Sequence, residues 1–188
     1  MDIQIPPILP ELEKVCHDIG FTMPSDRDAG SLLRSLVASK PKGRFLELGT
    51  GVGLSLAWMV DGMDTGSTTI RIDNDLELTK LATKYFGNDK RVSLICQDGS
   101  VWIKEHLNQK FDLIFADAWP GKYSELEETL NMLNPGGIYI IDDMNPQPNW
   151  PEGHQAKATH LTQYLLSRSD LQCSQLDWST GVILATKI

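Results

Sequence analysis

Three glycines at every second position form the first segment of this chain whose residue types indicate ligand binding. Gly49, Gly51 and Gly53 follow the short run 45–48 and precede a helical pattern that begins near Leu54. Glycine lacks a Cβ atom, so a ligand can lie directly against the backbone of such a loop. The free N–H groups at the start of the next helix favour an anionic group such as a carboxylate or phosphate. The loop therefore predicts a binding site for a partly anionic ligand.

The spacing of these glycines argues against one common ligand. A dinucleotide fingerprint has the form G-x-G-x-x-G, and its third glycine would fall at position 54, where this chain has leucine. A dehydrogenase that uses NAD is also disfavoured because the chain is too short for a second, substrate-binding domain.

Carboxylates stand at the ends of all five strands that we expect in the central part of the chain. In an open parallel sheet, ligands bind at the carboxyl ends of the strands. Nothing in the packing of a strand requires an acid there, so the repetition indicates a functional edge of the sheet. The five acids are Glu47, Asp73, Asp98, Asp117 and Asp142, the last followed by Asp143.

Asp73 lies about twenty residues beyond the glycine loop, where an acid can accept hydrogen bonds from both hydroxyls of a ribose. Its neighbour Asn74 is a second candidate for that contact. The alternative is a strand-end acid that caps the following helix. The segment Asp98-Gly99-Ser100 could similarly bind the edge of an adenine, cap the next helix, or do both.

The expected elements explain how these side chains come together. Amphipathic helices are predicted at 11–19 and 31–39, with an irregular stretch at 22–30 between them. Strands are then predicted at 44–48, 68–73, 92–97, 111–117 and 138–142. Helices at 54–62, 76–86 and 101–107 alternate with them, and a fourth opens at the capping box Ser124-x-x-Glu127 and ends at 134–137. Such alternation is typical of an α/β fold with a mostly parallel sheet.

The C-terminal part departs from this alternation. A helix is predicted at 155–167, and strands at 171–177 and 182–187 are separated by only four residues. That gap is too short for a helical crossover, so the last two strands should pair antiparallel. We expect seven strands with helices on both faces, in one domain whose N-terminal helical segment, 1–40, packs on a core formed by 41–188.

Composition limits the class of protein. A chain of 188 residues with 41% hydrophobic content fits one soluble domain, and its net charge of −8 disfavours a nucleic-acid substrate. The first ten residues lack the pattern of a signal peptide, and no apolar run is long enough to span a membrane. Three widely separated cysteines fit reduced thiols in a cytoplasmic protein, and no His/Cys cluster suggests zinc.

The loop and its surroundings together resemble a known family. The glycines at 49, 51 and 53 are similar to motif I of the class I methyltransferases that use S-adenosylmethionine (SAM). The order of elements, with five alternating units and a terminal hairpin, is similar to the Rossmann-like fold of that class. More closely, the chain resembles the small O-methyltransferases related to catechol and caffeoyl-CoA O-methyltransferases. The matching segments are 45–55, 72–73, 111–123 and 135–144, and the upstream segment 23–33 resembles the part of the family that closes over SAM.

The resemblance implies a role for each candidate in binding SAM. Glu47 would hold the loop and the methionine part of SAM, or simply accept hydrogen bonds from loop N–H groups. Thr50 and Ser55 would reach the ligand carboxylate or cap the helix. Trp119 would stack on the adenine, form a wall of the acceptor pocket, or only pack.

Trp58 and Trp102 lie inside expected helices and should belong to the core, and Asp112 lies at the wrong end of its strand for the site.

The same resemblance implies a divalent cation such as Mg²⁺ beside the methyl donor. Its ligands would be Asp117, Asp142 and Asp143, where the family has an Asp-Asn pair at the last two positions. The cation would lower the pKa of acceptor hydroxyls and orient one oxygen toward the methyl carbon. The alternative is a pair of solvated loop acids at 142–143.

One departure concerns the general base. The family usually has a lysine three residues after the acid at position 117, and this chain has Pro120 there, followed by Gly121 in an expected turn. The base is therefore Lys122, His154 or absent. The proline-rich loop 144–154, which includes Pro148, Asn149 and Trp150, should form an aromatic wall for a planar acceptor.

The leading hypothesis is a SAM-dependent methyltransferase that acts on an oxygen of a small molecule, with family resemblance also implying a homodimer. Two alternatives stay open at this level. One is a metal-independent methyltransferase for oxygen, nitrogen or sulfur acceptors. The other is a protein that binds SAM without catalysis.

Overall fold

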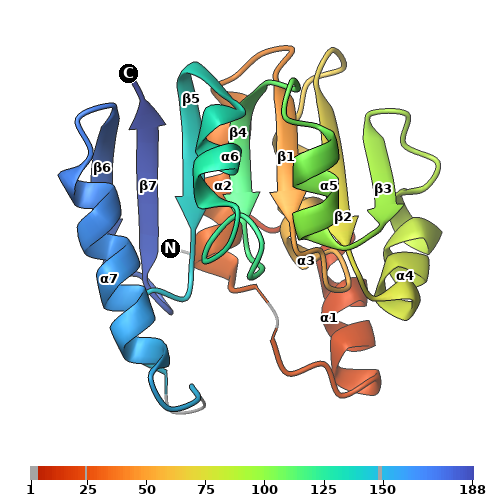
Figure 1. Cartoon of the computed structure of the whole chain (residues 1–188). Helices are drawn as coiled ribbons and strands as arrows, with labels where there is room; N and C mark the ends of the chain where they lie inside the picture. Colours follow the sequence, from red (N-terminus) through yellow and green to blue (C-terminus); the bar gives the residue numbers. More distant parts are fainter. Residues whose placement is uncertain (1–3, 24, 148–149) are drawn as a thin grey trace.

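The computed structural model describes residues 4–23, 25–147 and 150–188, and it shows one twisted sheet with helices on both sides (Figure 1). The strands are β1 (Arg44–Leu48), β2 (Thr68–Asp73), β3 (Val92–Cys96), β4 (Phe111–Ala116), β5 (Leu133–Ile141), β6 (Leu171–Leu176) and β7 (Val182–Lys187). The helices are α1 (Leu9–Asp18), α2 (Arg27–Ala38), α3 (Leu54–Gly62), α4 (Leu76–Phe86), α5 (Gly99–Glu105), α6 (Leu126–Asn131) and α7 (His154–Ser167).

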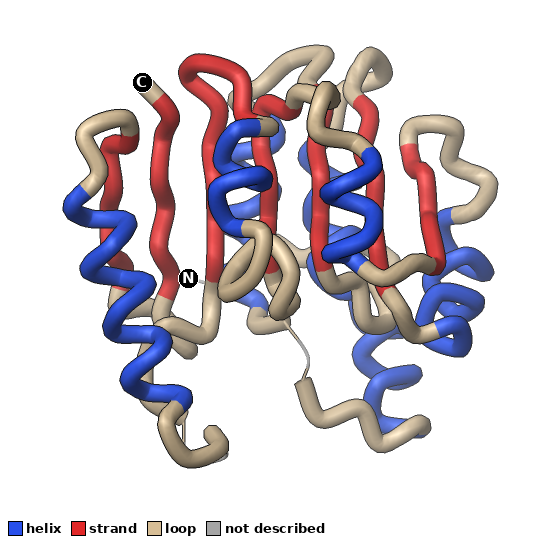
Figure 2. The backbone as a smooth tube through the Cα atoms, viewed as in Figure 1, coloured by secondary structure: helices blue, strands red, loops and turns tan. Residues whose placement is uncertain are grey.

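The strands form one sheet in the order β3-β2-β1-β4-β5-β7-β6, seen from right to left in Figure 1. The first five pair parallel, whereas β7 lies antiparallel between β5 and β6. This order confirms the predicted α/β fold and the terminal antiparallel hairpin. It also puts the carboxyl ends of the parallel strands at one edge of the sheet, the lower edge in the same view, where the loops gather (Figure 2).

Each face of the sheet is covered by its own set of helices. On one face, Trp102 of α5, Leu130 of α6 and Leu161 of α7 pack against Ile114 and Tyr139 of the sheet. On the other face, side chains of α2 and α3 pack against β1 and β4, and the apolar residues of α1 join the cluster around Trp58. Trp58 and Trp102 are each only 1% exposed, which confirms their assignment to the core.

The N-terminal helices pack on this core through α3. Leu9 and Leu12 of α1 are fully buried beside Trp58, and Leu33 of α2 is buried beside Met59. Their tight approach needs a small residue, because a Cβ added at Gly30 would lie 2.3 Å from the Trp58 ring. The division of the chain at residue 40 stays a prediction.

Strand β5 begins earlier than the sequence pattern indicates. We predicted a strand from 138 and a helix end at 134–137, but β5 starts at Leu133. The pairing with β4 shifts between Phe111↔Leu133 and Leu113↔Ile138, so the Pro-Gly-Gly segment is accommodated as an irregularity within the strand pair. Glycine and proline here mark a bulge and not the end of an element.

The predicted capping box at 124–127 is wrong. Helix α6 begins at Leu126 after Glu125, which has φ 50° and makes no side-chain cap. The Glu125 carboxylate instead accepts a hydrogen bond from the Ser100 hydroxyl at 2.5 Å and pairs with Lys104. Glu127 points away and contacts Arg168 of the C-terminal region. Tertiary contacts with Arg168 have therefore taken Glu127, the acid that the local pattern assigned to capping.

Two helices begin before their predicted starts because an aspartate caps each one. The Asp26 carboxylate accepts from the N–H groups of Asp28 and Ala29, so α2 starts at Arg27 within the stretch predicted to be irregular. The Asp98 carboxylate accepts from the N–H of Val101 at 2.9 Å, so α5 starts at Gly99. These shifts are small, and residues 21–23, 25 and 26 line one cavity together with the start of α5.

Two further findings bear on the chain as a whole. No helix among the described residues is long and apolar enough to cross a membrane. Cys16, Cys96 and Cys173 are free thiols, as expected from their number and separation.

Candidate active site

The glycine loop is shaped by close packing that only glycine allows. Gly49, Gly51 and Gly53 all have positive φ, at 91°, 50° and 100°. A Cβ at Gly49 would lie 2.7 Å from the backbone oxygen of Asp117, and one at Gly51 would lie 3.0 Å from the ring of Phe21. The loop is therefore held between the end of β4 and the N-terminal segment, and no side chain caps the start of α3. Its open helix N-terminus suits an anionic group.

Asp73 organises this loop directly. Its Oδ2 accepts hydrogen bonds from the N–H groups of Thr50 at 2.8 Å and Gly51 at 2.9 Å, and its Oδ1 accepts from Asp75 N at 2.8 Å. A carboxylate offers about four acceptor positions, so the three bonds leave capacity for a hydroxyl donor. The structure thus shows that Asp73 stabilises the loop, and its contact with a ribose stays a prediction.

Glu47 lies behind the loop in a fully buried ion pair. It faces Arg71 across the parallel pair β1–β2, and both side chains have 0% exposure. Burial raises the pKa of Glu47 to about 7, although Arg71 and the Ser55 hydroxyl oppose this rise. Burial also lowers the pKa of Arg71, against the attraction of Glu47 and Asp73. The Glu47–Arg71 ion pair therefore lies in the core next to the glycine loop and stabilises the position of the loop.

Arg71 was missed by the sequence interpretation. The signal was available, because Arg71 is the single charged residue before the terminal acid of an otherwise uncharged strand. A cation at that point of a doubly covered strand needs a buried partner. The residue in register with it on β1 is Glu47.

Asn74, Asp98, Gly99 and Ser100 lie together at the ends of β2 and β3, on the side of the cavity away from Asp142. Asp98 caps α5, which confirms one of its two predicted roles. Ser100 is held by Glu125, and Gly99 is packed so closely that a Cβ would lie 2.9 Å from Pro120. The contacts of this group with an adenine stay a prediction.

Three carboxylates converge at the ends of β4 and β5. Oxygens of Asp117, Asp142 and Asp143 all lie within 4.8 Å of one another. Loss of hydration and the neighbouring Asp142 raise the pKa of Asp117 well above its usual range, and burial also raises the pKa of Asp142. The Asp142 Oδ1 atom is buried without a hydrogen-bond partner. We call this group the acid corner, and its chemistry favours a cation.

Lys122 reaches the acid corner through a tight turn. Its ammonium donates a 2.6 Å hydrogen bond to the backbone carbonyl of Asp142, and the side chain is only 5% exposed. The turn closes between the N–H of Tyr123 and the carbonyl of Trp119 at 2.9 Å. It requires glycine at 121, where φ is 83° and a Cβ would lie 2.3 Å from Leu48. The predicted turn is confirmed, and it directs a lysine five residues after Asp117 toward the acids.

An aromatic group lies next to this corner. The rings of Trp119 and Tyr123 have centroids 4.8 Å apart, and the His154 ring lies 4.5 Å from Trp150 and 5.2 Å from Tyr123. The Tyr123 hydroxyl and His154 Nε2 are 3.2 Å apart. Burial and the nearby Lys122 lower the pKa of His154, and burial raises the pKa of Tyr123 to about 12. Tyr123 was not singled out from the sequence, although it lies in the segment 111–123.

These parts line one cavity of about 990 Å³. It extends from Asp73 and Asp98 at one side to Asp142 and His154 at the other. Residues 21–23 and 25–26 contribute to its wall, where the Ser25 hydroxyl lies 3.5 Å from Asp117 Oδ2. The predicted site residues that line it are Gly49, Thr50, Gly51, Asp73, Asn74, Asp98, Gly99, Ser100, Asp117, Trp119, Lys122, Asp142, Asp143 and His154.

Three predicted ligand contacts do not line the cavity. Glu47, Gly53 and Ser55 are buried behind the loop, where Ser55 is 2% exposed and Gly53 packs near Phe86. They shape the loop from within the core. Pro148 and Asn149, which we included in the acceptor wall, lie outside the described residues.

The family model for O-methyltransferases matches residues 2–188, nearly the whole chain. The chain belongs to this O-methyltransferase family. Among curated proteins it is similar to catechol O-methyltransferase B of Danio rerio, with 24% identity over 147 residues, which are 73% of this chain and 56% of that protein. The chain spans about half the length of the curated relatives it matches first.

Solved structures confirm the fold of this O-methyltransferase family member. An O-methyltransferase from Bacillus cereus in complex with SAH has a TM-score of 0.84 and 18% identity, over 99% of this chain and 93% of that one. The O-methyltransferase TomG from Streptomyces achromogenes in complex with SAM has a TM-score of 0.81 and 19% identity, over 98% and 91%. The predicted class I methyltransferase fold is therefore confirmed.

Proposed function

We propose that this chain transfers a methyl group from SAM to an oxygen of a small-molecule acceptor. The observation that carries the proposal is that one cavity joins the glycine loop and Asp73 to the acid corner and Lys122. Asp117 lies where the two parts meet, since its backbone packs against Gly49 and its carboxylate belongs to the acid corner. Donor and acceptor would therefore meet beside Asp117.

The donor half suits a nucleoside that carries a charged amino acid. The start of α3, which has no side-chain cap, favours the methionine carboxylate of SAM. Asp73, with its remaining acceptor capacity, favours the ribose hydroxyls, and Asp98 and Ser100, which line the same cavity, would contact the adenine. The SAM and SAH found in the similar structures from Streptomyces achromogenes and Bacillus cereus support this assignment.

The acceptor half must remove a proton while the methyl group moves. Methyl transfer forms an oxygen–carbon bond as the sulfonium–carbon bond breaks, leaving a neutral thioether and releasing the hydroxyl proton. The protein contributes alignment, exclusion of water and activation of the oxygen. In its neutral amine form, Lys122 is the group best placed to accept that proton and become an ammonium, because a fixed turn holds its nitrogen at the backbone carbonyl of Asp142. His154, hydrogen-bonded to Tyr123, borders the same cavity and serves as part of its wall.

The acid corner also fits a divalent cation. Its three carboxylates converge, and the unpartnered Asp142 Oδ1 atom is a free oxygen ligand. Asp117, Asp142 and Asp143 would hold such an ion, which would supply Lewis acidity toward the acceptor hydroxyl. Titration calorimetry with Mg²⁺ should show binding to the wild type and about tenfold weaker binding to Asp142→Asn. Equal binding by both proteins would remove the cation from this corner.

A metal-independent enzyme is the second candidate, and Lys122 favours it. The Lys122 ammonium already supplies positive charge to Asp117 and Asp142, opposing the rise of both pKa values. Turnover that is unchanged after removal of divalent cations would support this candidate. Turnover that is lost and then restored by Mg²⁺ would support the first.

The function is tested with SAM that carries an isotopically labelled methyl group. The chain is incubated with labelled SAM and hydroxylated aromatic compounds such as catechol, and the products are analysed by mass spectrometry. We expect the label to appear on an acceptor oxygen. In a parallel melting experiment SAM or SAH should raise the Tm and NAD should not, because only a ligand of the native state stabilises it. Stabilisation by NAD alone would contradict the proposal.

A further inference from the structure

A second hollow opens on the outer side of the acid corner, between α6 and α7. It has a volume of about 700 Å³ and we call it the α6–α7 groove. Both helices lie on the same face of the sheet, in front of it in Figure 1. The groove is lined by Trp119, Lys122, Tyr123, Leu126, Glu127, Glu128, Ala156, Lys157, His160, Leu161 and Tyr164.

The groove borders the candidate active site. Trp119, Lys122 and Tyr123 line both hollows, so the two are adjacent at this short segment. Lys122 is the residue whose ammonium reaches the backbone of Asp142. The part of an acceptor that extends away from the acid corner on this side would therefore pass Trp119 and Tyr123 and reach the groove.

The walls of the groove are mainly apolar and aromatic. Leu161 is 5% exposed and belongs to the core beneath the groove, and Leu126 and Tyr123 pack against the same core. Trp119 is 48% exposed, an unusual state for so large an apolar side chain. The Lys157 ammonium lies 4.6 Å from the centre of the Trp119 ring at the rim. Such walls favour a hydrocarbon or aromatic group, with charge confined to the edge.

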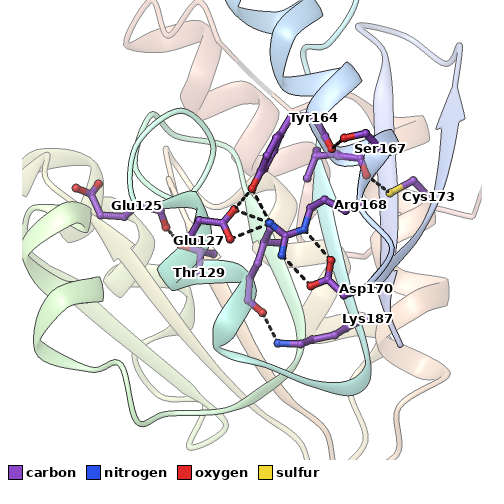
Figure 3. A network of polar contacts seen from close by, with 11 residues as sticks. Glu125, Glu127, Thr129, Tyr164, Ser167, Arg168, Asp170, Cys173 and Lys187 are labelled. Atoms are coloured by element: carbon purple, nitrogen blue, oxygen red, sulfur yellow. Dashed lines mark hydrogen bonds and ion pairs between the residues drawn. The ribbon is translucent and has the colours of Figure 1, made fainter.

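A polar network fixes the far end of the groove (Figure 3). The Tyr164 hydroxyl donates to Glu127 Oε1 at 2.6 Å, and the Arg168 guanidinium donates to both Glu127 oxygens at 2.6 and 2.8 Å. Arg168 also holds both oxygens of Asp170 at 2.9 and 2.7 Å. These bonds join α6, α7 and the segment before β6, so the separation of the two groove walls is set by fixed contacts.

We propose that the α6–α7 groove binds the apolar part of the methyl acceptor. The acceptor hydroxyl then lies at Lys122, and its apolar substituent packs against Leu126, Leu161 and Tyr164. This inference rests on the proposed function and adds to it the place of the acceptor's apolar part. The groove selects the acceptor through burial of that substituent.

The test uses two probe compounds, catechol and 4-butylcatechol, titrated into the chain saturated with SAH. Wild-type protein should bind 4-butylcatechol about tenfold more tightly, since butyl burial adds apolar contact. The variant Ala156→Phe fills the groove from its exposed wall on α7 and should remove this difference while leaving catechol affinity unchanged. Gln163→Phe, on the same helix but outside the groove lining, is the matched control and should keep the preference.

The test distinguishes failure of the proposed function from failure of the groove assignment. SAH is titrated first, and an absence of SAH binding would contradict the proposed function itself. Normal SAH binding with equal affinities for the two catechols in the wild type would overturn only the groove assignment. A preference that survives in Ala156→Phe would also overturn it, because the butyl group would then lie elsewhere.

Discussion

The ammonium of Lys122 donates a hydrogen bond of 2.6 Å to the backbone carbonyl of Asp142 from a turn that also carries Trp119. The turn is held by the Tyr139 hydroxyl, which donates to the carbonyl of Gly121 at 2.6 Å. A cation is thus fixed beside two carboxylates at the carboxyl edge of the sheet. This arrangement supports our proposal that Lys122 takes the acceptor proton even though proline occupies position 120.

Replacement of Lys122 should therefore affect chemistry more than binding. We expect Lys122→Met to lower kcat for methyl transfer by about 10²–10⁴, the usual contribution of a general acid or base. Affinity for SAH should stay nearly unchanged, because the hydrogen bonds of Lys122 go to Asp142 and Trp119 and not to the glycine loop or Asp73. Lys157→Met, which removes an exposed cation near Trp119, is the control and should retain kcat. Wild-type kcat in Lys122→Met would exclude Lys122 from proton transfer.

Neutralising one carboxylate of the acid corner should make the folded chain more stable. The pKa values of Asp117 and Asp142 are raised in the folded state, so ionisation costs more there than in the unfolded chain. Stability due to these groups is present at about pH 4 and is lost as pH rises through the raised values. In buffer without divalent cations, Asp142→Asn should therefore stabilise the protein by about 2 kcal/mol at pH 8.

Denaturant unfolding at pH 4 and pH 8 checks this prediction. The difference between Asp142→Asn and wild type should shrink at pH 4, where the acids are protonated in the folded chain and about half protonated in the unfolded chain. Asp143→Asn is the matched control, since Asp143 is less buried than Asp142 and asparagine tolerates its φ of 51°. A destabilised Asp142→Asn protein at pH 8 would show that the carboxylate is favourable in the corner.

The buried pair below the glycine loop predicts a strong coupling. Arg71→Met leaves the Glu47 carboxylate alone at 0% exposure, and we expect a loss of about 3–5 kcal/mol in the free energy of unfolding. The double variant Glu47→Leu/Arg71→Met removes both charges and should recover most of that loss. A double-mutant cycle with urea denaturation measures the coupling. Additive effects of the two substitutions would show that the pair does not interact.

The glycine loop should tolerate no side chain at its first position. In Gly49→Ala the new Cβ would lie 2.7 Å from a backbone oxygen, at a φ of 91°. We expect a loss of about 3 kcal/mol and weaker SAH binding, because the loop must move. Gly136→Ala has φ 73° and no atom within 4 Å of its Cβ, so it measures the cost of the backbone conformation alone. It should lower the free energy of unfolding by about 1 kcal/mol. Equal losses in both variants would contradict packing at Gly49.

Much of the fold follows from the sequence because its signals are local and mutually consistent. The alternation of apolar runs and helical patterns predicted all seven strands, and the four residues between β6 and β7 predicted their antiparallel pairing. The core positions of Trp58 and Trp102 followed from helical periodicity. By contrast, Ser124 and Glu127 satisfied a local capping pattern that tertiary contacts with Arg168 replaced.

The candidate site was predictable only in part. Its acids lie at strand ends, so Asp73, Asp117 and Asp142 could be grouped from topology alone. The approach of Lys122 to the acid corner could not be predicted, because it depends on how the turn at Gly121 packs against Leu48. Nor could the sequence show that Glu47 faces Arg71 and not the ligand cavity, since that depends on strand register.

We propose above all that the chain catalyses transfer of the SAM methyl group to an acceptor oxygen bound at the acid corner. It is tested most directly by following a carbon-13-labelled methyl group from SAM into 4-butylcatechol by NMR, with wild-type chain and Lys122→Met. The account predicts a labelled methoxy signal with the wild type and about 10²-fold slower labelling with the variant. A wild-type protein that binds SAH but leaves the catechol unlabelled would contradict it.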